Sequence, residues 1–160
     1  MKQVSNDILL IRNNVFTLTP VLLSFYEGCS VKENNLFLSF VIFPLLFNEK
    51  WIAQNPRITI KSKLAVWKDL HKLNLEGLPG RMEYFRDITI RCIQYAIDMK
   101  WIEIKKSKVC LNQQRMDEWK DSPFYQEQME SAKNINKMIH GMDVVTIFAT
   151  LDIKEVWKLR

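Results

Sequence analysis

The strongest constraint in this sequence is a run of twelve residues, Leu36 to Phe47, in which Ser39 is the only polar side chain. A helix that crosses a bilayer needs about 20 apolar residues, so this run is too short to span a membrane. A helix without a polar face is stable only where other parts of the chain surround it. The run therefore predicts a helix in the protein interior, which Pro44 bends or ends.

Helical spacing of apolar residues also predicts elements before and after this run. Residues 14–27 predict a first helix capped by Asn14, or a shorter one capped by Thr19, because Pro20 is best tolerated near a helix start. A further helix is expected over residues 62–73. With only four glycines and five prolines, the composition favours helices over a many-turned β fold.

The central part predicts two short helices followed by a hairpin. The helices are expected at 81–86 and 87–99, after the Gly77–Gly80 breaker, with Asp87 or Thr89 capping the second. Two short apolar runs follow, joined by a polar turn. Two helices and then a hairpin is the order of a winged helix. We expect a mainly α fold, a helical domain with a winged-helix-like β-hairpin around residues 101–112.

The C-terminal part predicts two more helices. Ser122-Pro123 is a typical helix start, Gly141 a stop, and Asp143 a cap for a short helix through Leu151. The chain divides by pattern into three parts that we expect to form one compact domain. They are N-terminal helices over 1–56, the winged-helix-like segment over 57–115, and C-terminal helices over 116–160.

Positive charge is concentrated in the centre of the chain. The net charge is +5, and residues 57–108 carry twelve basic and six acidic side chains. This excess suits a nucleic acid backbone, although a solvated lysine-rich surface is an equally simple explanation. The candidate DNA-binding residues are Lys105, Lys106 and Lys108 in the hairpin turn, Arg91 on the helix before it, and Lys61 and Lys63.

That preceding helix is a poor reader of DNA bases. Arg91 could contact a guanine and Gln94 an adenine, but Asp87 and Asp98 share roughly the same face. Carboxylates at that position would repel the phosphates. We therefore expect contact with double-stranded DNA, where it occurs, to be independent of sequence.

The polar residues do not form a catalytic or metal-binding pattern. His71 and His140 have no carboxylate or histidine at ligand spacing. Cys29, Cys92 and Cys110 are odd in number and lack metal-ligand spacing, as expected for reduced thiols in a cytosolic protein. No signal peptide is visible. We expect a cytoplasmic protein that is not an enzyme and binds no metal or cofactor.

The five tryptophans divide into two groups. Trp67 and Trp101 lie on apolar faces and are expected in the core. Trp51, Trp119 and Trp157 lie near the predicted ends of elements, where an aromatic side chain is often half-exposed. These three are candidate protein-interaction residues, and the alternative is that each covers a loop.

Four segments together resemble one known family, the middle component of bacterial three-component ABC-ATPase systems. They are Asn14 to Gly28, the apolar run Leu36 to Phe47, Thr89 to Ile104, and Ala132 to Ile153. The chain departs from the family pattern in two places, because Met99-Lys100 stands where the family often has a glycine before the strand, and Asp152 stands where it usually has glycine.

The resemblance implies two partners, an SMC/Rad50-like ABC ATPase and a third, effector-linked component, and a role in conflict with phages or plasmids. It supplies no catalytic residues. The resulting hypothesis is a non-enzymatic adaptor that links the ATPase to the third component and contacts DNA non-specifically. The alternative is a free-standing winged-helix transcriptional regulator.

Overall fold

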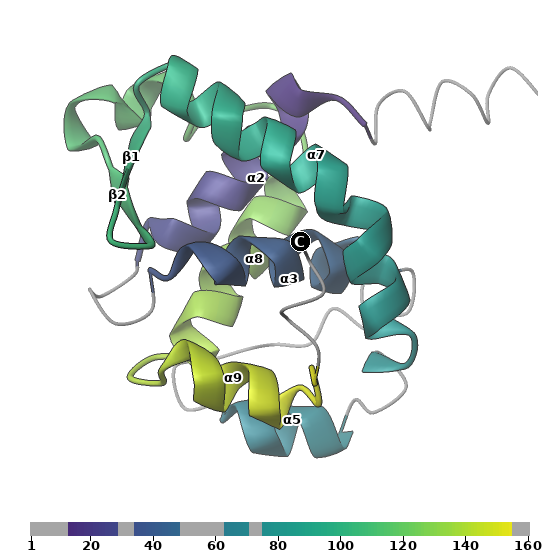
Figure 1. The fold of residues 1–160 in the computed structure, drawn as a ribbon. Coiled ribbons are helices and arrows are strands. Elements are labelled where there is room, and N and C mark those ends of the chain that lie inside the picture. Colours follow the sequence, from purple (N-terminus) through teal and green to yellow (C-terminus); the bar gives the residue numbers. More distant parts are fainter. Residues whose placement is uncertain (1–12, 29–33, 49–62, 71–74, 155–160) are drawn as a thin grey trace, which may run out of the picture.

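Helices form most of the fold, and the structure, a computed structural model, describes residues 13–28, 34–48, 63–70 and 75–154. The only sheet in these ranges is one antiparallel hairpin. Figure 1 shows the arrangement of the elements. In chain order they are α2 (Val15–Tyr26), η1 (Leu36–Leu38), α3 (Ser39–Leu46), α5 (Leu64–Leu70), α7 (Leu78–Asp98), β1 (Ile102–Lys105), β2 (Lys108–Leu111), η2 (Gln113–Glu118), α8 (Gln126–Met138) and α9 (Val144–Thr150).

The twelve-residue apolar run lies in the interior, as predicted. It forms η1 and then α3, and every residue from Leu38 to Leu46 except Phe40 is buried. Pro44 lies inside α3, and the helix ends two residues later, at Leu46. The main-chain carbonyl of Pro44 accepts a hydrogen bond from Nε of Arg81 at 3.0 Å, which ties the end of α3 to the start of α7.

Helix α2 is also mostly buried, and two of its buried hydroxyl groups form hydrogen bonds to the backbone of the same helix. Asn14 caps it, and the Asn14 side chain accepts the N–H of Phe16 at 2.9 Å, so the longer of the two predicted helices is correct. The hydroxyl of Thr19 donates to the carbonyl of Val15 at 2.7 Å, within the helix rather than at its start. Hydroxyls bonded in this way can be buried at little cost.

The prediction of two short central helices is wrong, because α7 is one continuous helix of 21 residues. The hydroxyl of Thr89 donates to the carbonyl of Phe85 at 2.8 Å and does not accept from first-turn amides. Thr89 is fully buried. A threonine can cap a helix or bond back within it, and here burial against α2 and α3 favours the continuous helix.

The hairpin is confirmed, with a tighter turn than predicted. Strand β1 pairs with β2 so that Lys105 lies directly opposite Lys108. Lys106 and Ser107 form the two-residue turn, with φ of 50° and 62°, as in a type I′ turn. The outer edge of β2 is also paired, because the N–H of Val109 donates to the carbonyl of Asn34 at 2.9 Å. Strand β2 therefore lies between β1 and the residues that lead into η1.

The predicted start of the C-terminal helix at Ser122-Pro123 is also wrong. Helix α8 begins at Gln126, and Tyr125 before it has a left-handed φ of 56°. The Ser122 side chain accepts the N–H of Phe124 in a loop, at 3.4 Å. Asp143 does cap the following helix as predicted, since its carboxylate accepts the N–H of Thr146 at 2.9 Å.

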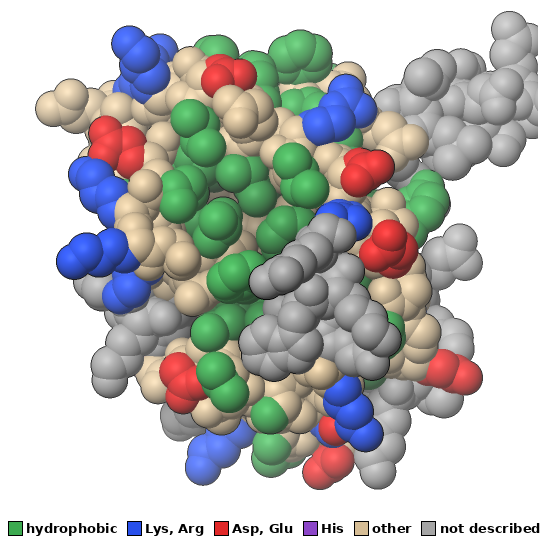
Figure 2. Space-filling view, viewed as in Figure 1, with side chains coloured by type: hydrophobic (Ala, Val, Ile, Leu, Met, Phe, Trp, Pro, Cys, Tyr) green, Lys and Arg blue, Asp and Glu red, His purple; other side chains and the backbone are tan. Residues whose placement is uncertain are grey.

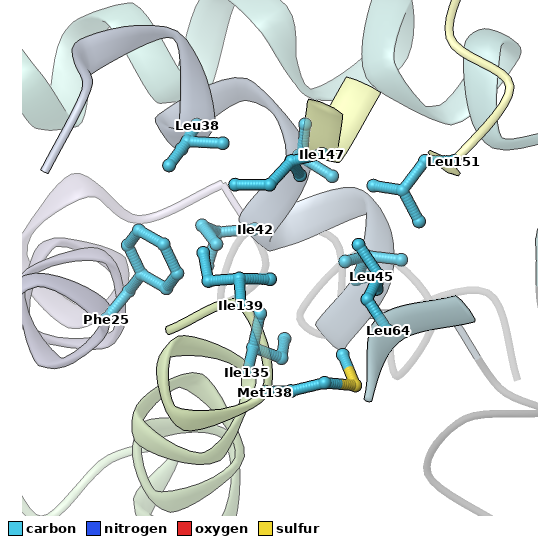
Figure 3. A pocket seen from close by; sticks show the side chains of 11 residues that line it. Phe25, Leu38, Ile42, Leu45, Leu64, Ile135, Met138, Ile139, Ile147 and Leu151 are labelled. Carbon is cyan, nitrogen blue, oxygen red and sulfur yellow. The ribbon is translucent and has the colours of Figure 1, made fainter. Parts of the chain in front are cut away.

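The core is assembled around α2, which packs against α8, α7 and α3. The side-chain amide of Asn136 on α8 donates to the carbonyl of Phe25 at 2.8 Å. Helices α5 and α9 pack together at the end of the molecule opposite α7 (Figure 1). Between α2, α3, α5, α8 and α9, a cavity of about 10 Å³ is lined by apolar side chains alone, among them Phe25, Ile42 and Leu64 (Figure 3). Such a gap has no group that could orient a polar ligand.

No helix in the described ranges has both the length and the apolar character that crossing a membrane requires.

Candidate interaction surface

The hairpin tip brings three of the predicted DNA-binding lysines together. Lys105 and Lys108 lie opposite each other and Lys106 is exposed between them, an arrangement in which like charges repel. Figure 2 shows basic side chains gathered along this edge of the molecule. The ammonium of Lys105 contacts Glu103 at 2.6 Å, and this hydrogen bond lowers the pKa of Glu103. The tip is therefore positive, and Glu103 offsets one of its charges.

Arg91 lies apart from this tip. It is exposed on α7 and borders a shallow hollow of about 590 Å³ together with the start of α2. The hollow beside the hairpin, of about 920 Å³, is bordered by a different side of α7, through Ile97. Gln94, next to Arg91 on the surface, donates to Asp98 at 2.8 Å. A side chain committed to a neighbouring carboxylate is a weaker reader of DNA bases.

The remaining lysine candidates are not brought to the hairpin. Lys63 is exposed just before α5, which lies at the bottom of Figure 1, away from the hairpin at the left. Lys61 lies outside the described residues. A further lysine on α5, Lys68, which is not among the candidates, contacts Asp152 at 2.5 Å. Within the described ranges, the predicted DNA-binding residues thus occupy three separate places rather than one basic surface.

One of the three tryptophans predicted to mediate protein contacts is buried. Trp119 is only 2% exposed, so the prediction that it is half-exposed is wrong. The sequence did not reveal η2, which turns the chain so that the residue after it enters the core. Trp51 and Trp157 lie outside the described residues. Trp67 and Trp101 are buried, as predicted.

The structure reveals an apolar surface that the sequence analysis missed. Figure 2 shows hydrophobic side chains gathered between the hairpin, α7 and α3. These elements and η1 contribute six apolar side chains that are exposed or only partly buried. We call them the apolar face: Phe37, Phe40, Ile90, Ile93, Ile97 and Ile104. The signal in the sequence was the i, i+3, i+7 spacing of the three isoleucines of α7, which is equally typical of a core-facing stripe.

The titratable groups of the described residues do not converge on one reactive centre. No group of three or more His, Cys, Asp or Glu side chains in these ranges could hold a metal ion. The shifted carboxylates belong to surface contacts; the pKa of Glu118, for example, is lowered by its hydrogen bonds from Arg115 and Trp101. Burial raises the pKa of the Cys92 thiol to about 11, which keeps it protonated and unreactive at neutral pH.

A comparison with known protein families shows which family the chain belongs to. The family described as ABC-three component (ABC-3C) system Middle Component 3 matches residues 1–155. The chain belongs to this family. The match covers nearly the whole sequence, and it confirms the resemblance seen in the four segments. No curated protein and no solved structure matches the chain.

In this Middle Component 3 protein, the two places where the family's glycine is absent each follow the end of a helix. Lys100 follows α7 with a φ of 57°, and Asp152 follows α9 with a φ of 58°. The next residue in each case donates its N–H back into the helix, from Trp101 to Ala96 and from Ile153 to Phe148, both at 2.9 Å. This is the Schellman helix end, which favours glycine at the left-handed position. The chain keeps that geometry with less favourable residues.

Proposed function

We propose that this chain is a non-enzymatic adaptor, which links an SMC/Rad50-like ABC ATPase to a third, effector-linked component in a system directed against phages or plasmids. The observation that carries the proposal is the family match over residues 1–155, because the family is named for a middle component in a three-component ABC system. A middle component that acts as an adaptor needs surfaces for its neighbours, and the apolar face supports the proposal because it offers a candidate for one of them.

The distribution of polar groups supports contact rather than catalysis. Ion pairs such as Lys68 with Asp152 and Lys120 with Asp117 have an exposed carboxylate and join neighbouring elements or turns. A catalyst instead needs a nucleophile, base or metal held in a cleft by neighbouring polar groups.

The arrangement of elements supports a winged-helix-like core with a different helix pair from the one predicted. The order is α2, a bridge at Asn35, α3, α7 and then the hairpin, with β2 between β1 and Asn35. In this assignment α3 and α7 form the helix pair, α7 is the second helix, and β1–β2 is the wing. The residues between α3 and α7, which include α5, are then an insertion.

The test is reconstitution with the two proteins encoded beside this chain. A tagged copy expressed with both is expected to co-purify with the ATPase and with the third component in fixed proportions. The ATPase and the third component should bind each other less well when this chain is omitted. If the chain elutes alone from the mixture, or turns over a substrate by itself, the adaptor proposal is wrong.

A second candidate activity is contact with double-stranded DNA through the hairpin tip, which the three clustered lysines favour. Changing Lys105, Lys106 and Lys108 to Glu is expected to weaken retention of DNA by the assembled system. The slope of log K against log salt should also fall by about 3, one for each lysine removed from a phosphate. A matched control changes Lys63, Lys137 and Lys154 to Glu, which alters net charge equally at exposed sites outside the hairpin.

No observation in the structure favours a free-standing operator-binding regulator. The exposed side of α7 carries Glu83, Asp87 and Asp98, and its one exposed arginine is Arg91. In the alternative hypothesis the isolated chain would shift its own promoter DNA, with a steep dependence on salt.

A further inference from the structure

The apolar face draws on four elements, η1, α3, α7 and β1, and Figure 2 shows hydrophobic side chains gathered between the hairpin, α7 and α3. Its central row is Ile90, Ile93 and Ile97, on one side of α7, with Ile90 46% and Ile97 37% exposed. Val66, Phe124 and Val145 are more exposed, but they lie on other elements: Val66 on α5, Phe124 in the loop before α8, and Val145 on α9. Single exposed apolar residues are ordinary, whereas a contiguous apolar patch marks an interaction site.

We propose that the apolar face binds an amphipathic α-helix of another component of the system, oriented with acidic residues against the hairpin tip. This inference rests on the proposed adaptor function, since it names what the adaptor binds and where.

The shape of the face favours a helix. Ile90, Ile93 and Ile97 follow one another at i, i+3 and i+7, so they form a ridge about 10 Å long on α7. A second apolar border is supplied by Phe37 and Phe40, on η1 and α3, which packs against α7. A helix laid between two such borders inserts its own apolar row between their side chains.

The charges around the face define the polarity of this helix. At the hairpin end stand Lys105, Lys106 and Lys108, which favour acidic residues in whatever lies against them. Along the solvent side of α7, the exposed Glu83 and Asp87 favour basic residues instead. The occupant therefore has an apolar row, acidic residues at one end, and a lysine or arginine beside α7.

This combination disfavours DNA on the same surface. Isoleucine and phenylalanine side chains offer no hydrogen-bond donor to a phosphate, and the two carboxylates of α7 repel it. A basic tip next to an apolar surface is the arrangement expected for protein docking, in which the apolar centre supplies affinity and the charged border selects the partner.

The experiment measures the affinity of the full-length chain for the ABC ATPase and for the third component encoded beside it. The test variant is I90D/I97D and the matched control is V145D, an exposed valine changed to the same residue on α9. We expect I90D/I97D to weaken binding of one component by about 100-fold, about tenfold for each side chain. V145D should bind within about twofold of the wild type.

Two further variants keep the test decisive if I90D/I97D does not fold. F37D places a charge on the other border of the face and should weaken binding by about tenfold. K106E tests the orientation and should weaken binding of the same component by about fivefold to tenfold. Hydrogen exchange on the wild-type complex should show protection of residues 90–97.

The possible outcomes separate this inference from the adaptor proposal. If wild type binds a component and I90D/I97D and F37D bind it equally well, the adaptor stands and this docking site is wrong. If K106E weakens only retention of DNA, the acidic orientation of the helix is wrong. If wild type forms a dimer that I90D/I97D dissolves, the face is an interface between copies. If wild type binds neither component, both proposals fail.

Discussion

The indole N–H of Trp101 donates to the carboxylate of Glu118, with 2.8 Å between Nε1 and Oε2. Arg115 contacts the two oxygens of the same carboxylate at 2.7 and 3.0 Å. Trp101 directly precedes β1 and Glu118 is the last residue of η2, so this hydrogen bond joins the start of the hairpin to the 3-10 helix that follows it. The next residue, Trp119, is buried in the core.

Replacing Glu118 with Ala is expected to lower the urea midpoint of unfolding, because a nearly buried indole N–H then has no acceptor. The measurement is far-ultraviolet circular dichroism across a urea titration. Asp117→Ala is the matched control, since the carboxylate of Asp117 contacts Lys120 at the surface and the loss of this ion pair should change the midpoint little. Equal midpoints for the two variants would contradict the structural role of Glu118.

The Glu118 contact also predicts a dependence on pH. Hydrogen bonds from Arg115 and then Trp101 lower the pKa of Glu118 in the folded chain. The stabilisation is therefore present above the unfolded pKa of about 4.3 and is lost as pH falls through the lower folded value. The difference in urea midpoint between wild type and Glu118→Gln should be constant from about pH 7 to about pH 5 and shrink below about pH 4. If the difference in urea midpoint instead grows as the pH falls, the ionised form of Glu118 does not stabilise the fold and the prediction is wrong.

The left-handed helix end at Lys100 predicts a stabilising substitution. Lys100→Gly should raise the free energy of unfolding by about 0.5–1 kcal/mol, because relief of the left-handed backbone exceeds the added entropy of glycine in the unfolded chain. Lys100→Ala is the control: it removes the charge but keeps a Cβ, and so should give no such gain. Asp152→Gly should gain less, because it also removes the ion pair with Lys68. Thermal unfolding of the three variants checks this order.

The burial of Trp119 predicts that it matters for stability and not for docking. Trp119→Ala should lower the free energy of unfolding by about 3–5 kcal/mol, the usual cost of removing a buried aromatic side chain. Phe124→Ala, at a residue 53% exposed, should cost under about 1 kcal/mol. If Trp119→Ala instead folds with normal stability but no longer binds the partner, Trp119 is an interaction residue and this prediction is wrong.

Local pattern predicted well the elements whose signals were also local. The cap at Asn14, the cap at Asp143 and the hairpin after Trp101 each depend on neighbouring residues, and all three are present in the structure. The start of α8 was missed because Ser122-Pro123 is equally suited to a turn. The left-handed Tyr125 that actually precedes α8 has no signature in the sequence.

The candidate surface was predicted less well, because exposure depends on which elements pack together. A row such as Ile90, Ile93 and Ile97 has the same spacing whether it faces the core or the solvent. Only the positions of α2 and α3 against α7 decide that this row stays open. The same holds for Lys63 and Lys106, which share a basic segment of sequence, because Lys63 precedes α5 and Lys106 lies in the hairpin turn, and these elements are apart in Figure 1.

By itself, the sequence determined the helical character of the chain, its buried central run and its hairpin, because periodicity and capping act within a few residues. Tertiary structure alone decided that α7 is unbroken, that Trp119 is internal and that an apolar face remains beside the hairpin. These features follow from burial free energy, which depends on contacts between segments far apart in the chain.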